Sequence, residues 1–481
     1  MTTALPPIGW AGILRLGLVQ TSLGAIIVLT TSTLNRVMVV EFLLPAMIPG
    51  ALVALHHLVQ ISRPRWGYGS DVGGRRTPWI IGGMALLALG GVLASVATAW
   101  MSVNLVAGIN LAILAFILIG VGVGACGTSL LVLLAKRVGE RQRAAAATTV
   151  WLMMILGFII TASIAGHFLD PFSPERLVMV TASTAAIALV VTLMAVYGLE
   201  GPALVVKATP VTRTAALATD DQTRAAASAP AAADAIRTDG FRQAMAQVWS
   251  EPKARRFAVF VFVSMLAYSA QDLILEPFAG TVFGLTPGES TKLAGIQNGG
   301  VLMGMVLLAF MGSSGWGRRY GTLQDWTVRG CISSAIALVA LSAGAFYAPH
   351  WPLHLTVFAL GAANGLFAVA AIGSMMGLVD TGREQREGVR MGLWGAAQAL
   401  AFGLGGFLGT LAIDVARFLL QSPVLAYACV FTGEALLFLV SAALALRVTR
   451  PMTPKELGAT PAPPLQVAGN PPRTETEVSL S

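Results

Sequence analysis

Charge is scarce in this sequence. Asp, Glu, Lys and Arg make up only 11% of its 481 residues, whereas apolar residues make up 56% and the mean hydropathy is +0.75. Soluble domains carry about 25% charged residues, so this composition excludes that class and indicates a chain that crosses a membrane many times. The net charge of +8 does not indicate nucleic-acid binding, because the basic residues lie in short segments between apolar runs, where they report membrane orientation.

Cysteine is scarce too, and motifs of common enzymes are missing. Cys126, Cys331 and Cys429 lie in apolar runs without the spacing of metal ligands, so neither a disulfide framework nor a metal site is expected. Aspartate-rich motifs that hold a diphosphate through magnesium are absent from the segments at the membrane edge, and Asp220-Asp221 stands alone. The glycine-rich runs are not followed by Lys-Ser or Lys-Thr, which argues against a nucleotide loop. We therefore expect a protein that is not an enzyme.

Long apolar runs are what the sequence has in abundance. A transmembrane helix needs about 20 predominantly apolar residues, and twelve segments meet this requirement. We therefore predict an all-α polytopic membrane protein with spans at about residues 11–33, 41–62, 78–100, 106–135, 145–169, 177–199, 257–281, 291–312, 326–347, 353–379, 391–416 and 424–446.

Lys and Arg are distributed unevenly between the connecting segments. They gather in every second segment, whereas the alternate segments hold few of them, chiefly Arg36, Arg176, Lys292 and Arg417. Short loops that are rich in Lys and Arg stay on the cytoplasmic side of a membrane. Both termini are therefore expected in the cytoplasm.

The chain contains an internal repeat at an offset of 243 residues. Gly74-Arg75-Arg76 recurs as Gly317-Arg318-Arg319, and a second basic segment that starts at Gly139 recurs from Gly382. Two segments with the same offset indicate two parallel six-helix halves. The expected domains are a first half at 1–199, an Ala- and Thr-rich cytoplasmic linker at 200–256, a second half at 257–447 and a disordered cytoplasmic tail at 448–481.

The polar stretch from Arg63 to Trp79 separates the second and third apolar runs. Its pattern resembles the signature loop of the major facilitator superfamily, G-x-x-x-D-R-x-G-R-R, although Val72 replaces the basic residue after the aspartate. In that family the loop is a structural latch that does not select the substrate, and the resemblance implies the same role here. Ser314 stands at the repeat position of Asp71, so the acidic member occurs only in the first half. The expected latch residues are Gly67, Asp71, Gly74, Arg75, Arg76, Arg318 and Arg319.

Two carboxylates occur in the seventh apolar run. Asp272 and Glu276 are four residues apart and therefore share one face of a helix, and acidic residues inside a membrane mark functional sites by default. Two interpretations stay open. Glu276 lies toward the outer end of its span, where Arg36 can pair with it structurally, or the carboxylates bind a ligand or partner directly. The spans otherwise hold few acids, with Glu434 placed near a span centre.

The same run carries a narrower resemblance. The pattern Q-D-x-x-x-E-P-F-x-G-x-V-F-G, with Gln271, Asp272, Glu276 and Pro277, resembles the hallmark of the PucC family, a branch of the major facilitator superfamily found in phototrophs. The loop from Arg63 to Trp79 is similar to that family's loop as well. The resemblance covers the twelve-helix body, to which the linker and the tail add nothing.

The resemblance to the PucC family implies both a fold and a function. The fold is that of the major facilitator superfamily, in a bacterial inner (intracytoplasmic) membrane. The function is assembly of light-harvesting antenna, with the core complex favoured over the peripheral one, by delivery or shielding of bacteriochlorophyll during insertion of antenna polypeptides. The expected partners are antenna polypeptides, the reaction centre, bacteriochlorophyll or its biosynthetic enzymes, and the lipid bilayer.

Bacteriochlorophyll needs an axial ligand for its magnesium, usually an imidazole, and a flat apolar slot. His56 and His57 lie inside the second span on faces about 100° apart, so at most one of them faces a central cleft. Gln297 and Asn298 lie near the repeat-equivalent level of the eighth span. These four residues either line a pigment site or form hydrogen bonds between helices, which is the commoner case. The alternative function is a proton-coupled transporter of a small solute.

Overall fold

The computed structural model describes residues 8–62, 75–139, 142–200, 249, 252–313, 321–379 and 387–448. Within these ranges the regular secondary structure is helical throughout. Eleven of the described helices are long and apolar enough to cross a membrane, and a shorter apolar helix, Met47–Val59, lies at the second predicted span. The predicted all-α polytopic architecture is confirmed.

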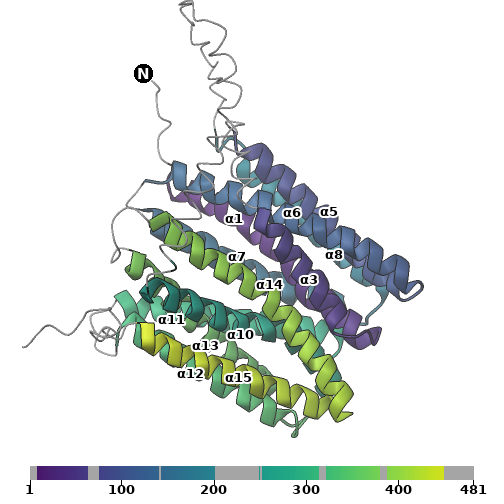
Figure 1. Ribbon diagram of the computed structural model, residues 1–481. Helices are drawn as coiled ribbons and strands as arrows, with labels where there is room; N and C mark the ends of the chain where they lie inside the picture. Colours follow the sequence, from purple (N-terminus) through teal and green to yellow (C-terminus); the bar gives the residue numbers. More distant parts are fainter. Residues whose placement is uncertain are drawn as a thin grey trace, which may run out of the picture.

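The helices cross the molecule back and forth in one bundle (Figure 1). We call the end of the bundle that holds Trp10 and Val448 the terminal face and the opposite end the far face. The helices are α1 (Trp10–Val28), η1 (Leu29–Thr33), α2 (Leu34–Arg36), η2 (Val37–Glu41), α3 (Met47–Val59), η3 (Gln60–Ser62), α5 (Thr77–Met101), α6 (Leu105–Arg137), α7 (Arg143–Phe168), α8 (Pro174–Val196), α10 (Pro252–Phe283), α11 (Pro287–Ser313), α12 (Leu323–Gly344), α13 (Leu353–Val379), α14 (Glu387–Leu420) and α15 (Pro423–Val448).

The first span is longer than the sequence predicts. It runs without a break through α1, η1, α2 and η2 to Glu41, whereas the predicted span ends at residue 33 and the next starts at 41. The added turns hold two polar residues, Asn35 and Arg36, beyond the predicted end of the span. Both are buried, with exposed fractions of 1% and 2%. The π-helical stretches η1 and η2 flank these two residues, and such stretches often occur at functional sites.

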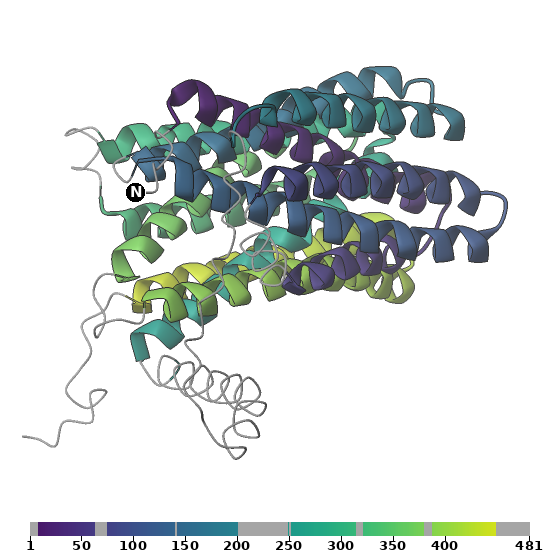
Figure 2. The same ribbon diagram turned by 90° about the horizontal axis from the view of Figure 1, so that it is seen from above.

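The helices divide into two halves that meet along two helix pairs. The helices up to α8 share one core of buried apolar side chains, and those from α10 onward share a second core, with a few residues crossing at the interface. The halves meet chiefly where α3 packs against α14 and where α7 packs against α11. Figure 1 shows the purple and blue helices of the first half beside the teal to yellow helices of the second. The view in Figure 2 shows the blue turn between α5 and α6 at the far face, on the right.

Glycines inside the spans let helix backbones approach closely. A Cβ atom on Gly122 would lie 2.6 Å from the backbone nitrogen of Leu87, and one on Gly405 would lie 2.6 Å from the carbonyl oxygen of Leu266. Membrane helices associate through small residues of this kind because lipid supplies no hydrophobic drive between them. These contacts fix α5 on α6 and α10 on α14, which places the polar side chains of α10 inside the bundle.

Candidate functional site

The motif of the seventh span lies on α10, in the half of the helix that approaches the far face. Gln271 is fully buried, Glu276 is 2% exposed and Asp272 is partly buried. At about 1.5 Å of rise per residue, Asp272 lies roughly 16 Å and Glu276 roughly 10 Å along the helix from its end at Phe283. Polar groups this deep in an apolar bundle need partners, so the neighbouring side chains decide what they can do.

Asp272 connects α10 to α11. The side-chain amide of Gln297 on α11 donates a hydrogen bond to its Oδ1 across 3.4 Å. Asp272 also interacts electrostatically with Glu434 on α15 and with Tyr268 on its own helix. Two carboxylates that sense each other in a buried site repel when both are ionised. The second half therefore holds two acidic side chains, on α10 and α15, that influence each other inside the bundle.

Gln271 and Glu434 lie on the faces of α10 and α15 that pack together. Gln271 shares its face with Phe278, and Glu434 shares its face with Tyr427, because residues seven apart align along a helix. The ring of Phe278 lies 5.3 Å from that of Tyr427 and 4.9 Å from that of Phe431, so these faces meet. Among the described residues, neither the Gln271 amide nor the Glu434 carboxylate has a hydrogen-bond partner. The interior of the second half thus holds two polar groups whose hydrogen-bonding capacity the described residues leave unused.

Pro277 of the motif has a partner in the first half of the chain. Proline lacks a backbone N–H, so inside α10 it leaves the carbonyl of Leu273, four residues earlier, without its helical donor. The side-chain amide of Asn35 donates to this carbonyl across 2.6 Å. The Leu273 carbonyl thus recovers a donor from the opposite half, which ties the first span to α10 in the interior of the bundle.

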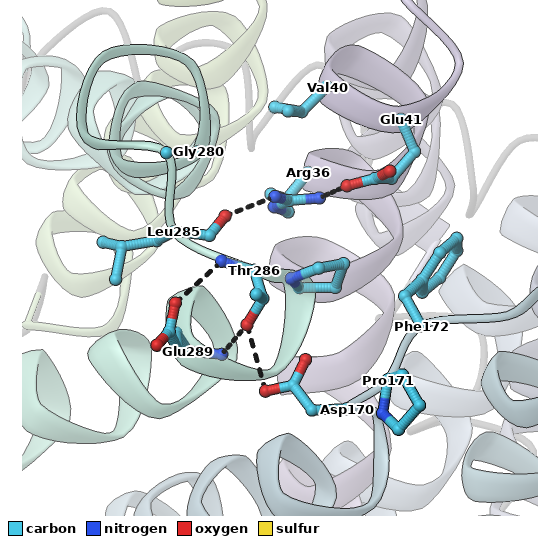
Figure 3. Close-up of a pocket in the computed structure, with 12 residues that line it drawn as sticks. Arg36, Val40, Glu41, Asp170, Pro171, Phe172, Gly280, Leu285, Thr286 and Glu289 are labelled. Atoms are coloured by element: carbon cyan, nitrogen blue, oxygen red, sulfur yellow. Dashed lines mark hydrogen bonds and ion pairs between the residues drawn. The ribbon is translucent and has the colours of Figure 1, made fainter.

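Arg36 lies at the boundary between the halves, close to the far face. Its guanidinium pairs with Glu41 on the next turn and donates a hydrogen bond of 2.6 Å to the carbonyl oxygen of Leu285, just after α10 (Figure 3). Glu276 lies near enough to interact electrostatically with Arg36. The direct ion pair of Arg36 is therefore with Glu41, and Arg36 acts on Glu276 through its charge.

An open cavity of about 780 Å³ lies around Arg36 on the far face. Figure 3 shows its lining residues from both halves, with Asp170 and Phe172 on one side and Thr286 and Glu289 on the other. Most of the polar atoms drawn there are engaged in hydrogen bonds within the protein. We therefore assign this cavity to the seam between the halves rather than to the candidate site.

The two adjacent histidines of the second span have different neighbours, although their ring centroids lie 4.2 Å apart. His56 is 2% exposed, and its ring nitrogens lie 3.0 Å from the Val53 carbonyl and 2.9 Å from the Gln60 amide of its own helix. His57 is half-buried and faces α14 across the interface, with its ring centroid 6.0 Å from that of Phe402. His57 therefore lies at the seam between the halves, whereas His56 lies within its own half.

Gln297 and Asn298 face different neighbours. Gln297 reaches Asp272 on α10, whereas the side chain of Asn298 donates to the Ala294 carbonyl of its own helix across 2.9 Å. Gln297 thus connects two helices, which is the commoner role that the sequence leaves open for the pair.

Most of the predicted latch lies outside the described residues, including Gly67, Asp71, Gly74, Arg318 and Arg319. Arg75 and Arg76 are described, at the start of α5. The carboxylate of Glu200 accepts hydrogen bonds from the backbone N–H groups of Arg76, across 2.7 Å, and Thr77, across 2.8 Å. Glu200 thereby caps α5, a role that no local pattern in the sequence indicates.

The chain is similar to known proteins over most of its length. A family model described as "PUCC protein" matches residues 33–453. The "Bacteriochlorophyll synthase 44.5 kDa chain" of Rhodobacter capsulatus is 49% identical over 441 residues, which cover 92% of this chain and 96% of that protein. "Protein PucC" of the same organism is 29% identical and covers 90% of this chain and 91% of its own.

Solved structures with a similar fold are transporters. A peptide transporter POT in complex with sulfate has a TM-score of 0.62 at 15% identity, covering 93% of this chain and 97% of its own. The nucleoside transporter NupG has a TM-score of 0.60 at 12% identity, covering 92% of this chain and 100% of its own. Identity this low carries only the fold, which is that of the major facilitator superfamily, as predicted.

Proposed function

Since the chain belongs to the PucC protein family, we propose that it is an assembly factor for bacterial light-harvesting antenna that handles bacteriochlorophyll while antenna polypeptides are inserted. This proposal rests on the similarity to a relative of nearly equal length. That relative is 49% identical, and its name refers to bacteriochlorophyll synthesis. We favour the core antenna as the client. The role is proposed to be non-catalytic, with any pigment synthesis left to partner enzymes.

Bacteriochlorophyll is the proposed ligand, and His57 is the residue that fits it best. An axial ligand must present an imidazole nitrogen beside an apolar surface. His57 is half-buried at the interface of the halves and next to the ring of Phe402, whereas His56 is 2% exposed within its own half. When bound, the pigment would supply a magnesium ion that imidazole coordinates. Gln297 fits less well, because its amide already contacts Asp272.

The distribution of Lys and Arg along the sequence supports a membrane orientation. We propose a bacterial inner membrane, with the terminal face and both termini on its cytoplasmic side, and the alternation of Lys and Arg between the connecting segments of the sequence supports this orientation. Antenna polypeptides, the reaction centre and enzymes of bacteriochlorophyll synthesis are the proposed partners. Such partners would reach the protein through the bilayer or from the terminal face.

A second candidate function is proton-coupled transport of a small solute. It is favoured by the acidic side chains Asp272 and Glu434, which lie on α10 and α15 inside the second half, because acidic residues within a membrane mark proton and ion pathways. The transporter fold of the solved relatives is compatible with this function but does not select it.

Deletion of the gene in a phototrophic host tests the proposal. We expect the deletion strain to lose core-antenna absorption in whole-cell spectra while it keeps reaction-centre absorption, and we expect a plasmid copy of the gene to restore the antenna. A strain that builds normal antenna contradicts the assembly role. If the same strain loses uptake of a solute, the transporter function is supported instead.

A further inference from the structure

Two aspartates at the far face each bind the start of a helix in the opposite half. Asp414 belongs to α14 in the second half and contacts the N-terminus of α3 in the first half. Asp170 follows α7 in the first half and contacts the N-terminus of α11 in the second half. The contacts therefore cross the same seam in opposite directions.

Asp414 caps α3. One carboxylate oxygen accepts from the backbone N–H of Ala46 across 2.9 Å, and the other accepts from the N–H of Met47 across 2.8 Å. The first N–H groups of a helix have no helical acceptor, and the partial positive charge there favours a carboxylate. Ala46 has no polar side chain with which to cap its own helix. The missing cap of α3 is therefore supplied from the other half.

Asp170 makes the equivalent contact with α11. Its carboxylate accepts from the Thr286 hydroxyl across 3.0 Å and from the backbone N–H of Gly288 across 3.2 Å. Figure 3 shows Asp170 and Thr286 facing each other from the two sides of the seam. A Cβ atom on Gly288 would overlap the Asp170 carboxylate, so this approach requires glycine at position 288.

The internal repeat relates the two contacts. Asp414 follows Asp170 by 244 positions, one more than the repeat offset of 243. The same offset relates α3 to α11 and α7 to α14, the helix pairs through which the halves meet. The aspartates are thus equivalent groups of the two halves, and each holds the repeat-equivalent helix of the other half.

We propose that Asp170 and Asp414 form a paired clamp that holds the far face closed, and that the two halves separate at this face when both contacts break. Arg36, which donates to the Leu285 carbonyl across the same seam, reinforces the closed state. The two aspartate contacts involve helix ends and not deep side chains, so a rocking motion can break and remake them without disturbing either core. This inference does not depend on the proposed ligand.

A buried residue at the seam can report opening. Thr291 is fully buried on α11, and its hydroxyl lies 3.1 Å from that of Thr33 on the first span. We would label Thr291→Cys with a polar thiol reagent on detergent-purified protein, in which both faces meet the reagent. Cys429, which is exposed, is replaced by alanine, whereas Cys126 and Cys331 are buried and stay.

Substitution of both aspartates by alanine removes both contacts between the halves, whereas α11 keeps the cap made by its own Thr286 and Glu289. Loss of one such contact shifts an equilibrium by roughly 2- to 30-fold, so the labelling rate in Asp170→Ala/Asp414→Ala should rise about tenfold or more, with intermediate rates in the single variants. Asparagine keeps only one of the two acceptor oxygens and loses the charge, so Asp170→Asn/Asp414→Asn should label at a rate between those of the parent and the alanine double variant. Glu175→Ala, an exposed far-face carboxylate, serves as the matched control.

Two outcomes overturn the clamp. One is an unchanged labelling rate in an alanine double variant that still elutes as a monodisperse species. The other is an equal rise in the Glu175→Ala control, which would mean that loss of a far-face carboxylate, and not of a contact between the halves, is responsible. If the alanine double variant does not fold, the two single variants, which each keep one contact, decide the question by the same comparison.

Discussion

At the scale of single residues, the proline of the seventh-span motif is explained by an asparagine more than two hundred positions away. Pro277 withdraws the helical donor of the Leu273 carbonyl, and Asn35 replaces it across 2.6 Å. Neither residue indicates the other in the sequence, because a proline in a membrane helix is ordinary and an asparagine after a Thr-rich stretch suggests a loop. Only the packing of the first span against α10 joins them.

This pair predicts a double-mutant cycle. Asn35→Leu leaves a buried carbonyl without a donor, which should lower the free energy of unfolding by about 1–3 kcal/mol. Pro277→Ala restores the helical N–H, so Asn35→Leu should cost much less in that background. The measurement is thermal unfolding, in one detergent, of the parent, the two single variants and the double variant. Equal costs of Asn35→Leu with and without Pro277 would show that the contact does not act as described.

At the scale of elements, the sequence predicts which segments form helices but not where those helices end. The twelve apolar runs indicate the spans because hydrocarbon selects long apolar segments whatever their neighbours. The first span reaches Glu41 instead of residue 33 because Asn35 and Arg36 are satisfied by α10 and the residues after it, which local hydropathy does not register. The caps by Asp170, Asp414 and Glu200 are missed for the same reason.

The contact between α11 and α13 provides an element-scale prediction. A Cβ atom on Gly304 would overlap the Ala362 carbonyl of α13, whereas one on Gly299 would meet nothing within 4 Å. Gly304→Ala should therefore lower the free energy of unfolding by about 1–3 kcal/mol, because overpacking displaces the helices. Gly299→Ala is the matched control and should be neutral or stabilising by up to about 1 kcal/mol, since alanine favours helix.

Thermal unfolding in detergent tests this pair of variants. A Gly304→Ala protein as stable as the Gly299→Ala protein would mean that α11 and α13 are further apart than described.

At the scale of the whole molecule, the repeat predicts the two halves, and the structure adds how they meet. The 243-residue offset is visible in two basic segments of the sequence, and the structure places the equivalent helices α3 and α11 against α14 and α7. Near the far face, side chains such as Arg36 and Asp414 join the halves by hydrogen bonds to backbone groups at helix ends of the other half. These partners are distant in sequence. The sequence predicts candidate residues for a site. It does not predict that Asp272 contacts Gln297 or that His57 faces α14.

The most direct test of the proposed pigment role is an absorption spectrum of the tagged protein, purified in mild detergent from phototrophic cells that are building antenna. The account predicts a far-red bacteriochlorophyll band and co-purified antenna polypeptides, identified by mass spectrometry. It also predicts that His57→Leu weakens the band, whereas His354→Leu, at an exposed position, leaves it unchanged. A colourless preparation without antenna polypeptides, obtained repeatedly from such cells, would contradict the account.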